Sequence, residues 1–260
     1  MKIFKTNHQI TYITIIIVVL SISSCNEDYL DIKSHKPESE EISASDAEKL
    51  VNATYNIFLN WNMSSFSWIG MSSITSDNAY KGSDPGDPGR DKDLLDAFKF
   101  TSSTLVFAEV WEEHYKGIQR ANQTLSRIVA FENLDEDLRN RLIGETKFLR
   151  ALIYFRLVKC FGGVPLIAGT DSLDKDLSEV LKRASQKDVY AFIEKDLEDA
   201  ITKLPKKSEY EAAQIGRATE GAAKALLAKV SMYQNKWQEA WDLTDEIMKS
   251  NEYDLTPSYE

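Results

Sequence analysis

Apolar residues recur at helical spacing in a stretch that begins near residue 45. The sequence SDAEKLVNATYNIFLNW opens with Ser45 and Glu48, and a serine followed three residues later by a glutamate is typical of a capping box at a helix N-terminus. The apolar positions expected to share one face of this helix are Leu50, Ala53, Ile57 and Trp61. Because residues three and four apart lie on one side of a helix, the pattern predicts an amphipathic first helix.

Two long helices are predicted between residues 105 and 161. The apolar face of the first carries Val106, Val110, Trp111, Tyr115, Ile118, Ala121, Leu125 and Ile128. The corresponding stripe of the second carries Leu138, Leu142, Glu145, Leu149, Leu152 and Phe155. The second helix is expected to end at Gly162 and Gly163, before Pro165, because glycine adopts the conformation that follows a last turn and proline cannot continue a helix. Trp111 and Leu149 are expected in the core.

A connector at 166–184 leads to another predicted helix. Ser185 and Asp188 have the spacing of an N-terminal cap. The apolar residues that follow at helical spacing are Val189, Ile193, Leu197, Ala200 and Leu204. Pro205 marks the expected end of this helix.

The last two predicted helices span 219–233 and 237–249 and are joined by Gln-Asn-Lys. Leu227 and Ala228 in the first, and Ala240 twelve positions after Ala228 in the second, match the spacing of a tetratricopeptide repeat. Small residues at these places let two helices approach closely, and Leu227 is expected in the core. Several successive hairpins predict an all-α fold of tetratricopeptide-like helical hairpins.

Residues 62–104 interrupt the helical pattern. Gly, Pro and Asp cluster at 82–91, a composition that disfavours a helix. The pattern therefore predicts a long irregular loop within a helical scaffold. Long loops inside compact domains are uncommon and are often functional, so this segment is the first place to expect a ligand site.

Aromatic and polar side chains of this loop are the candidates for ligand contact. The flat apolar face of a sugar ring stacks on tryptophan or tyrosine, while its hydroxyl groups seek carboxylates, amides and arginine. The candidates in or beside the loop are Trp61, Trp68, Tyr80, Lys81 and Arg90. Trp61 and Trp68 also fit a second interpretation, in which they close the edge of the core. Tyr80, next to Lys81 and a Gly-Pro turn, is expected to be exposed.

The N-terminal segment has the layout of a secretory signal peptide. Lys2 and Lys5 precede an apolar run at 10–22, which is shorter than the roughly 20 apolar residues that a transmembrane span needs. Ile22-Ser23-Ser24-Cys25 is similar to a bacterial lipobox, in which the cysteine is acylated and becomes the new N-terminus. Residues 1–24 are therefore predicted to be a lipoprotein signal peptide, with Cys25 as the lipid attachment site. The alternative is an ordinary cysteine that lies near a signal peptide.

The rest of the chain divides into a tether and a domain. Residues 25–44 are polar and show little periodicity, which predicts a flexible tether between the lipid and the domain. The domain is expected to cover residues 45–260. Without its signal peptide the chain has a little over 230 residues, enough for one large domain or two small ones.

Charge and cysteine content argue against several classes of protein. The net charge is −10, and it becomes −12 without Lys2 and Lys5, whereas proteins that bind nucleic acid use Lys and Arg to pair with phosphates. No nucleic acid partner is expected. The chain has two cysteines, and if Cys25 carries lipid then Cys160 has no partner for a disulfide. Cys160 lies among apolar residues and is expected to be buried.

Paired acids are one pattern that could indicate an enzyme; a catalytic thiol at Cys160 is disfavoured because the mature chain has only His35 and His114 as a possible base. Glu112 and Glu113, or Asp135 and Asp137, could serve glycoside hydrolysis, which uses two carboxyl groups at a set separation. An acidic helical protein carries many such pairs on its solvated faces, and that interpretation is favoured. No catalytic residue is therefore assigned.

No cofactor or metal is expected. Four loop acids could favour calcium, namely Asp84, Asp87, Asp91 and Asp93. Their spacing does not match an EF-hand loop, and the sequence has no HExxH or CxxC motif. Glu145 and Arg150 lie among apolar residues and are expected to be buried polar groups that link helices.

Several stretches together resemble the SusD/RagB family of surface lipoproteins, which partner TonB-dependent glycan importers in Bacteroidetes. The stretches that carry the resemblance are SSCNEDYLD after the signal, SDNAY at 76–80, WEEHYKGIQRANQTL at 111–125, GETKFLRALIYFRLVKCFGGVPLI at 144–167, DVYAFIEKDLEDAITKLP at 188–205, GRATEGAAKALLAKVSMYQNKWQEA at 216–240 and YDLTPSYE at the end. Their order runs through nearly the whole mature chain.

The resemblance implies a function. A protein of this family is expected to be anchored in the outer membrane by lipid, to face the cell exterior, to capture an oligosaccharide or other nutrient, and to deliver it to a SusC-like TonB-dependent transporter. It also implies a ligand site near the long loop. Members of the family are longer than this chain, so either the sequence is a fragment or the protein is truncated, and ligand residues from a C-terminal half would then be missing. The alternatives from other classes are a lipid-anchored glycoside hydrolase and a helical-repeat adaptor without glycan affinity.

Overall fold

The structure, a computed structural model, describes residues 43–82, 84, 86–170 and 176–255, and the regular secondary structure within these ranges is helical. Within these ranges the only extended pairing is an isolated bridge between Pro165 and Arg183. The predicted all-α fold is therefore confirmed. The predicted signal peptide, Cys25 and the tether as far as residue 42 lie outside the described residues. No described helix has the length and hydropathy needed to cross a membrane.

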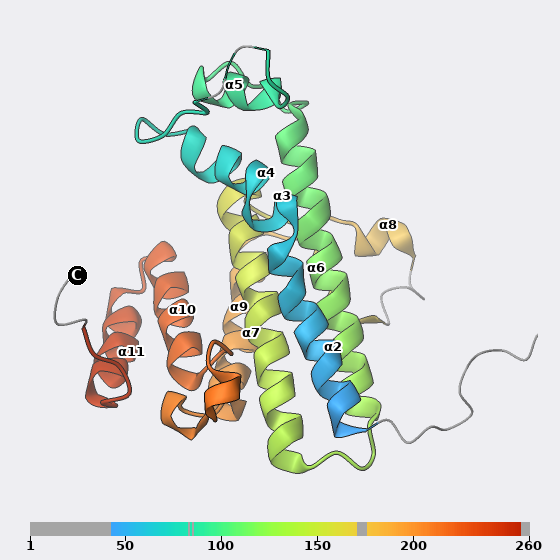
Figure 1. Cartoon of the computed structure of the whole chain (residues 1–260), viewed down its shortest axis with the longest axis vertical. Coiled ribbons are helices and arrows are strands. Elements are labelled where there is room, and N and C mark those ends of the chain that lie inside the picture. The colour runs from blue at the N-terminus through green and yellow to red at the C-terminus, as the bar shows by residue number, and fades with distance from the viewer. Residues whose placement is uncertain (1–42, 83, 85, 171–175, 256–260) are drawn as a thin grey trace, which may run out of the picture. The chain divides into compact units, whose positions relative to one another are not determined.

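Six helices of at least 13 residues form the scaffold (Figure 1). The long helices α6 and α7 run antiparallel, and α2 lies along both of them. On its other side α7 packs against α9, which in turn packs against α10, and α10 packs against α11. The bounds of these helices are α2 Ala44–Asn56, α6 Leu105–Ala130, α7 Glu136–Phe161, α9 Gln186–Lys203, α10 Glu220–Tyr233 and α11 Trp237–Lys249.

The first helix begins two residues earlier than its sequence predicted. The capping box is formed by Ser43 and Asp46, because the Ser43 hydroxyl accepts from the Asp46 N–H and the Asp46 carboxylate accepts from the Ser43 N–H. The prediction that Ser45 and Glu48 form this box is wrong. Glu48 instead pairs with Arg141 of α7, a partner far away in sequence.

The buried face of the first helix is also rotated by about one residue from the predicted face. The residues of α2 that are fully buried are Ala47, Val51 and Thr54. Leu50 and Ala53, which were expected on this face, are only half-buried. Trp61 does not belong to this helix, since α2 ends at Asn56 and a 3-10 turn follows, and 65% of Trp61 is exposed.

Helix α7 lies at the centre of the scaffold. Its sequence predicted one apolar stripe, but the helix is buried on most sides because α2, α6 and α9 all pack against it. The largest cluster of buried side chains includes Ile153, Tyr154 and Phe155 of α7, together with residues of α9 and α10. A helix that is covered on several sides needs apolar residues all round, so a single stripe underestimates its buried surface.

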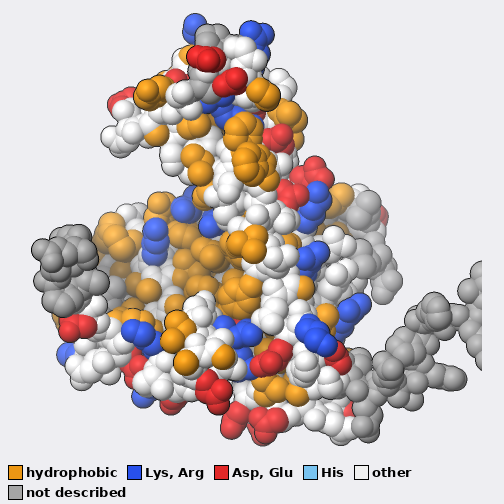
Figure 2. Space-filling view, viewed as in Figure 1, with side chains coloured by type: hydrophobic (Ala, Val, Ile, Leu, Met, Phe, Trp, Pro, Cys, Tyr) orange, Lys and Arg blue, Asp and Glu red, His pale blue; other side chains and the backbone are white. Residues whose placement is uncertain are grey.

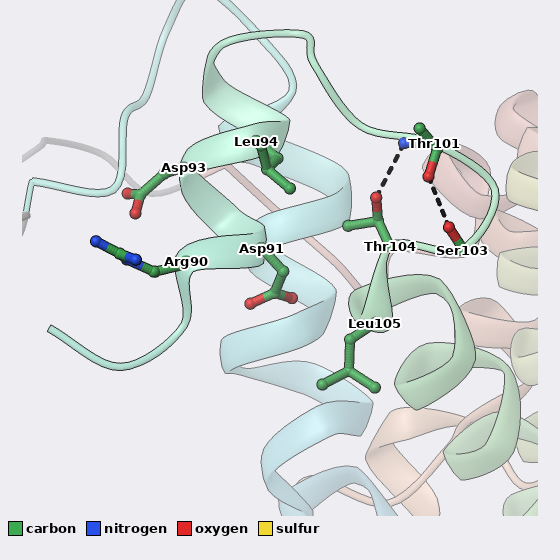
Figure 3. A pocket seen from close by; sticks show the side chains of 8 residues that line it. All are labelled: Arg90, Asp91, Asp93, Leu94, Thr101, Ser103, Thr104 and Leu105. Carbon is green, nitrogen blue, oxygen red and sulfur yellow. Dashed lines mark hydrogen bonds between the residues drawn. The ribbon is translucent and has the colours of Figure 1, made fainter.

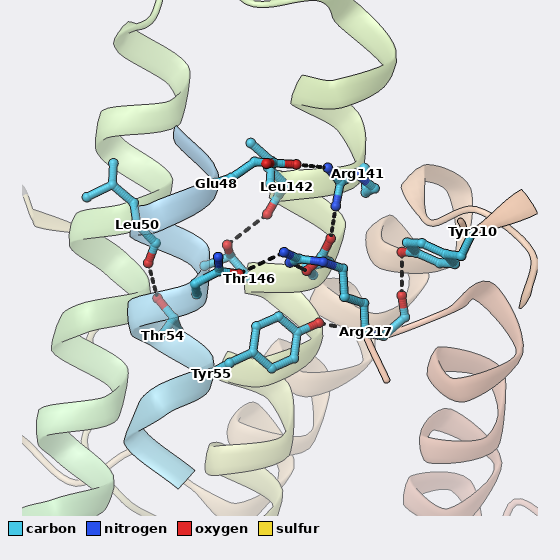
Figure 4. Close-up of polar contacts among 12 residues, drawn as sticks. Glu48, Leu50, Thr54, Tyr55, Arg141, Leu142, Thr146, Tyr210 and Arg217 are labelled. Atoms are coloured by element: carbon cyan, nitrogen blue, oxygen red, sulfur yellow. Dashed lines mark hydrogen bonds and ion pairs between the residues drawn. The ribbon is translucent and has the colours of Figure 1, made fainter. Parts of the chain in front are cut away.

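A buried network of charged groups connects α7 to α2 and to the segment before α10 (Figure 4). Glu145 has no exposed surface, and its carboxylate accepts from Arg141 at 2.9 Å and from Arg217 at 2.8 Å. Beside it the Tyr55 hydroxyl accepts from the Ala218 N–H at 2.8 Å. The prediction that Glu145 is a buried polar group that links helices is confirmed. A buried carboxylate needs such partners because burial alone disfavours its charge.

The helix ends after α6 agree closely with the sequence predictions. Gly162 follows the last residue of α7 with φ +71°, a conformation that favours glycine. The Ser185 hydroxyl caps α9 by accepting from the Asp188 N–H at 3.1 Å, and α9 ends two residues before Pro205. In the connector between α7 and α9, the described residues 162–170 and 176–185 include the short helix α8 (Leu177–Val180).

Four predictions, three about the core and one about a cysteine, can be compared directly with burial. Leu149 and Leu227 are buried, as predicted. Trp111 is only partly buried and packs at the edge of the main cluster. Cys160 is exposed, so the prediction of a buried cysteine is wrong. Lys159 beside it is exposed too, which means that the last turn of α7 presents this side to solvent.

The predicted loop at 62–104 is more ordered than its composition indicated. It begins with short helical turns and contains a further short helix after the Gly/Pro/Asp cluster. These elements are α3 (Trp61–Ser64), α4 (Phe66–Ile69), a π-helical turn (Gly70–Ile74) and α5 (Arg90–Asp96). The turns form because their side chains pack on α6, a contact that the local sequence does not reveal.

Candidate functional site

A buried lysine holds the short helix α5 against the rest of the scaffold. Only 1% of Lys92 is exposed, and its ammonium lies 2.8 Å from Asp91 and 3.3 Å from Glu109 of α6. The same ammonium lies 4.1 Å from the centre of the Phe66 ring, in cation–π geometry. Because the charge has an acid from α6 and a ring from α4 as partners, α5 is fixed to both elements.

A glycine determines where α5 begins. Gly89 precedes the first helical residue with φ +88°, in the left-handed region that L side chains rarely adopt. A Cβ atom at this position would lie 2.6 Å from the Phe66 ring. Gly89 therefore provides both the turn and the close approach that allow Lys92 to reach its partners.

A hollow of about 800 Å³ opens between α5 and the start of α6 (Figure 3). Asp91 and Leu94 lie on the α5 side of it, and Arg90 and Asp93 project from the outer side of α5. The residues that line the opposite side are Thr101, Ser103, Thr104 and Leu105. Hydrogen bonds organise that side, since the Thr101 N–H donates to the Thr104 hydroxyl at 2.9 Å and the Thr101 and Ser103 hydroxyls lie 2.8 Å apart. The hollow thus combines charged groups, hydroxyls and two leucines.

Of the five candidate ligand residues, Arg90 and Lys81 lie at or near this hollow. Arg90 is one of the lining residues and is exposed, although its side chain points away from the hydroxyl-bearing side (Figure 3). The Lys81 side chain is 8% exposed and its ammonium lies 3.2 Å from Asp93, another lining residue. Tyr80, the neighbour of Lys81, is 76% exposed, in agreement with the expectation from sequence. The structure therefore brings the charged groups of Arg90, Lys81 and Asp93 to one side of α5.

Trp68 lies in a different environment from the other three. Its ring centre is 5.3 Å from that of His114 on α6, and the guanidinium of Arg156 lies 4.7 Å from the Trp68 ring. Arg156 also donates to the Met63 carbonyl at 3.0 Å. Trp68 is therefore packed between α4, α6 and α7, which agrees with the second interpretation of this residue, as closure for the edge of the core.

The buried histidine beside Trp68 predicts a pH-dependent stability. Burial lowers the pKa of His114 from 6.5 to about 4, against the raising effect of its hydrogen bond to the Val110 carbonyl. Between these pH values the unfolded chain binds a proton that the folded chain does not, so the free energy of unfolding is expected to decrease by up to about 3 kcal/mol as the pH falls from 6.5 to 4.

Urea titrations across this pH range, compared with the variant His114→Asn, would isolate the contribution of the histidine. Carboxylates change the stability of both proteins, so only the difference between them counts. An identical pH dependence in the two proteins would contradict the assignment.

Sequence reasoning missed the hydroxyl side of the hollow and two exposed aromatic residues next to it in sequence. Phe98 and Phe100 are 61% and 40% exposed, and Phe98 has φ +52°, which is uncommon for a bulky residue. They precede Thr101 and Ser103 in the sequence FKFTSS. Two aromatic residues directly before a cluster of hydroxyls were the signal that could have identified this side.

The paired acids considered for catalysis have structural partners. Glu112 and Glu113 both pair with Lys116, at 2.8 and 2.9 Å. Asp135 caps α7 by accepting from the Leu138 N–H. Among the described residues no three His, Cys, Asp or Glu side chains come together as a metal site requires.

Comparison with known proteins identifies the family. The family profile described as "SusD-like_3: Starch-binding associating with outer membrane" matches residues 28–232, well over half of the chain. This chain belongs to the SusD-like family. The resemblance found from the sequence is thereby confirmed.

Individual SusD-like relatives support the same assignment. SusD-like protein P25 of Formosa agariphila is 26% identical over 95% of this chain and 47% of its own length. A structure described as a laminarin-binding SusD-like protein is 32% identical, with a TM-score of 0.67 over 78% of this chain and 43% of its own. A SusD-like protein of Bacteroides fragilis is 28% identical, with a TM-score of 0.69 over 84% of this chain and 40% of its own. The chain thus spans about half the length of the relatives that it matches.

Proposed function

We propose that this protein captures an oligosaccharide at the cell surface and that the hollow beside α5 contributes to the binding site. The observation that carries this proposal is a hollow lined by charged and hydroxyl-bearing side chains, among them Arg90, Thr101 and Ser103. The exposed Tyr80 directly precedes Lys81, whose ammonium pairs with the lining residue Asp93. A tyrosine ring offers a face for stacking, and the polar groups offer partners for sugar hydroxyls. The family description names starch, and one similar structure is described as laminarin-binding; starch and laminarin are both glucans.

Four of the five candidate ligand residues take different roles in this proposal. Tyr80 and Arg90 contact the sugar, since both are exposed. Lys81 positions Asp93 through their ion pair at 3.2 Å. Trp68 supports the site from the core, because its ring is packed against His114 and Arg156.

Alanine at Tyr80 or at Arg90 is expected to weaken oligosaccharide binding about tenfold, since 1.4 kcal/mol is a factor of ten. Arg90 would lose a hydrogen bond from a charged group, which contributes about 1.5–3 kcal/mol, and Tyr80 would lose a stacking contact, which contributes about 0.5–1.5 kcal/mol. Calorimetry with oligosaccharides from starch and from laminarin would measure the effect. The matched control is Trp237→Ala, which removes another exposed aromatic ring, from α11. Unchanged affinity in both loop variants, measured in a chain of the relatives' full length, would place the site outside this hollow.

We also propose that the protein is attached to the outer membrane, facing outward, through lipid on Cys25. The lipobox sequence supports the anchor, and the family description supports association with the outer membrane. The variant Cys25→Ala is expected to leave the membrane fraction, because a soluble helical domain without acyl chains has no stable attachment. Cell fractionation measures this result, and protease treatment of intact cells measures the orientation. A variant that remained in the membrane fraction would contradict the anchor.

Delivery of the glycan to a SusC-like TonB-dependent transporter completes the proposal. An exposed hydrophobic surface on the last helical hairpin supports the proposal that a protein partner binds there. Trp237, Trp241 and Met248 are spaced to share the outer side of α11 and are 59–67% exposed. Figure 2 shows hydrophobic side chains gathered on the visible face near α10 and over α4 and α5. Large exposed hydrophobic patches are typical of interaction sites, and stacked helices offer a broad and rigid face.

The double variant Trp237→Gln and Trp241→Gln tests the proposed transporter surface separately from the glycan site. It is expected to reduce co-purification of the transporter and to leave glycan affinity unchanged. Tyr80→Ala is expected to do the opposite. Loss of both properties in either variant would show that the two surfaces are not separate.

Binding without hydrolysis is favoured over a glycoside hydrolase. Glu112 and Glu113 are engaged with Lys116, and Asp135 caps a helix. Incubation with each glycan that binds, followed by analysis of reducing ends, distinguishes the two functions. A helical adaptor would bind no glycan.

A further inference from the structure

A second hollow, which we call the α6 groove, lies farther along the same helix. It has a volume of about 450 Å³ and lies between α6, the segment at 165–170 and Leu181. Trp111 and Tyr115 form the aromatic part of its α6 wall, and Gln119 and Gln123 continue this wall toward the end of the helix. Sequence reasoning had placed Trp111 in the core, and nothing in the sequence indicated a groove here.

The wall opposite α6 is held in place by side-chain hydrogen bonds. The Tyr115 hydroxyl donates to the Pro165 carbonyl at 2.9 Å, and the Asn122 amide donates to the Ile167 carbonyl at 2.7 Å. The buried Arg150 donates to the Ala168 carbonyl at 2.9 Å. An irregular segment with this many partners is preformed, so a ligand that enters the groove does not have to order it.

The aromatic part of the groove is likewise fixed. The ring centres of Trp111 and Tyr115 lie 4.9 Å apart with 39° between the ring planes, and the Trp111 ring meets Phe161 edge-on at 5.2 Å. These contacts hold the tryptophan at the edge of the core while leaving it partly exposed. A fixed and partly exposed tryptophan can stack on a sugar ring without losing conformational freedom.

The α6 groove and the hollow beside α5 open toward the same side of α6. Thr104 and Leu105 line the hollow, while Trp111 and Glu112 line the groove. Each pair is separated by seven residues, which is close to two full turns and a rise of about 10 Å. Ala108 lies between them on this side and is exposed, so only a methyl group stands there. The two sites are therefore consecutive along one helix face.

The charge of the groove favours a neutral ligand. Glu112 and Lys116 neutralise each other through an ion pair at 2.8 Å at one end. The other polar side chains on the helix wall, Gln119, Asn122 and Gln123, are amides. Aromatic rings together with amides suit uncharged sugar rings, which offer apolar faces and hydroxyl groups.

We propose that the α6 groove is a second glycan subsite, and that the protein therefore prefers an oligosaccharide long enough to occupy both the hollow and the groove. This inference rests on the proposed function, because it assumes that the hollow binds sugar. Two linked subsites act on one chain as two linked epitopes do, so occupation of the second adds affinity without the full cost of a separate association.

Affinity as a function of ligand length tests the inference. Maltose and laminaribiose would be compared with the corresponding heptaoses by calorimetry on the lipid-free mature chain. For the unmodified protein the heptaose of the preferred series is expected to bind at least about tenfold more tightly than the disaccharide. The double variant Gln119→Ala and Gln123→Ala is expected to lose this gain while its disaccharide affinity is unchanged, since two hydrogen bonds contribute about that much.

Two further variants make the test specific. Trp111→Leu removes the stacking surface but keeps an apolar side chain at the edge of the core, and circular dichroism checks its fold. Gln238→Ala, on the exposed side of α11, is the control for loss of a surface glutamine and is expected to behave as the unmodified protein.

The possible results separate this inference from the proposed function. A length-dependent gain that persists in both groove variants, or no gain at all in the unmodified protein, would overturn the second subsite while leaving the hollow as a sugar site. Equal losses for short and long ligands would also overturn it, because the groove would then act only by supporting the hollow. Absence of binding in both glucan series would reject the proposed function in its glucan form, and the inference with it.

Discussion

Replacing Asp196 with alanine is expected to destabilise the folded protein by about 3–5 kcal/mol, the cost of leaving a buried charge without its partner. Asp196 accepts from both sides of the Arg150 guanidinium, at 2.7 and 2.8 Å, and the two side chains are only 4% and 6% exposed. The remaining guanidinium nitrogen donates to Asn122 and to the Ala168 carbonyl. Urea denaturation at neutral pH measures the change.

Two other variants show whether the charge itself is responsible. Glu198→Ala removes an exposed acid from the same helix and is expected to change the stability by less than about 0.5 kcal/mol. The double variant Arg150→Met and Asp196→Leu is expected to be more stable than Asp196→Ala alone, because it leaves no uncompensated charge. If Asp196→Ala unfolded at the same urea concentration as the parent, the ion pair would not be buried as described.

The second large effect is expected from Leu227→Ala, with a loss of about 2–5 kcal/mol. Leu227 is 4% exposed and belongs to the main cluster, where α10 meets α7 and α9. Truncation removes buried apolar atoms and leaves a cavity, and both changes destabilise the folded state. Thermal and urea denaturation measure the loss.

Met232→Ala provides the matched control for this substitution. Met232 lies on the same helix but is 50% exposed, so its truncation is expected to have little effect. Similar melting of the parent and both variants would show that the buried face of α10 has been assigned wrongly.

The buried ion pair also connects stability with the proposed glycan path. Arg150 holds the Ala168 carbonyl on the wall of the α6 groove, and Asp196 holds Arg150. A change at Asp196 is therefore expected to reach the groove through Arg150, although Asp196 does not line it. For this reason the variants chosen to test the groove are surface glutamines and not members of the buried pair.

The sequence alone was sufficient to predict helices and their ends where the signal comes from nearby residues. Gly162 ends α7, Ser185 caps α9, and Pro205 stops it, and each acts through its own backbone or through a hydrogen bond to a residue three positions away. Helical periodicity in the same way identified α10 and α11. Such features need no knowledge of the rest of the chain, and the family resemblance rests on the same local stretches.

Local signals misled where a distant partner decides the outcome. Glu48 has the right spacing for a capping box with Ser45, yet it pairs with Arg141, and the box forms at Ser43 and Asp46. Cys160 lies among apolar residues in sequence but is exposed, since neighbours in sequence on a helix point to different sides.

Both candidate glycan sites were decided by the tertiary structure. The hollow beside α5 exists because Lys92 reaches Glu109, and the α6 groove exists because Tyr115 and Asn122 bind carbonyl groups at 165 and 167. The sequence by itself determined that the protein is helical, that Tyr80 and Arg90 lie on an exposed segment, and which family it belongs to. It could not determine which side of α6 faces a cavity. That side is set by hydrogen bonds between residues 17 to 50 positions apart, and these residues meet only when the chain folds.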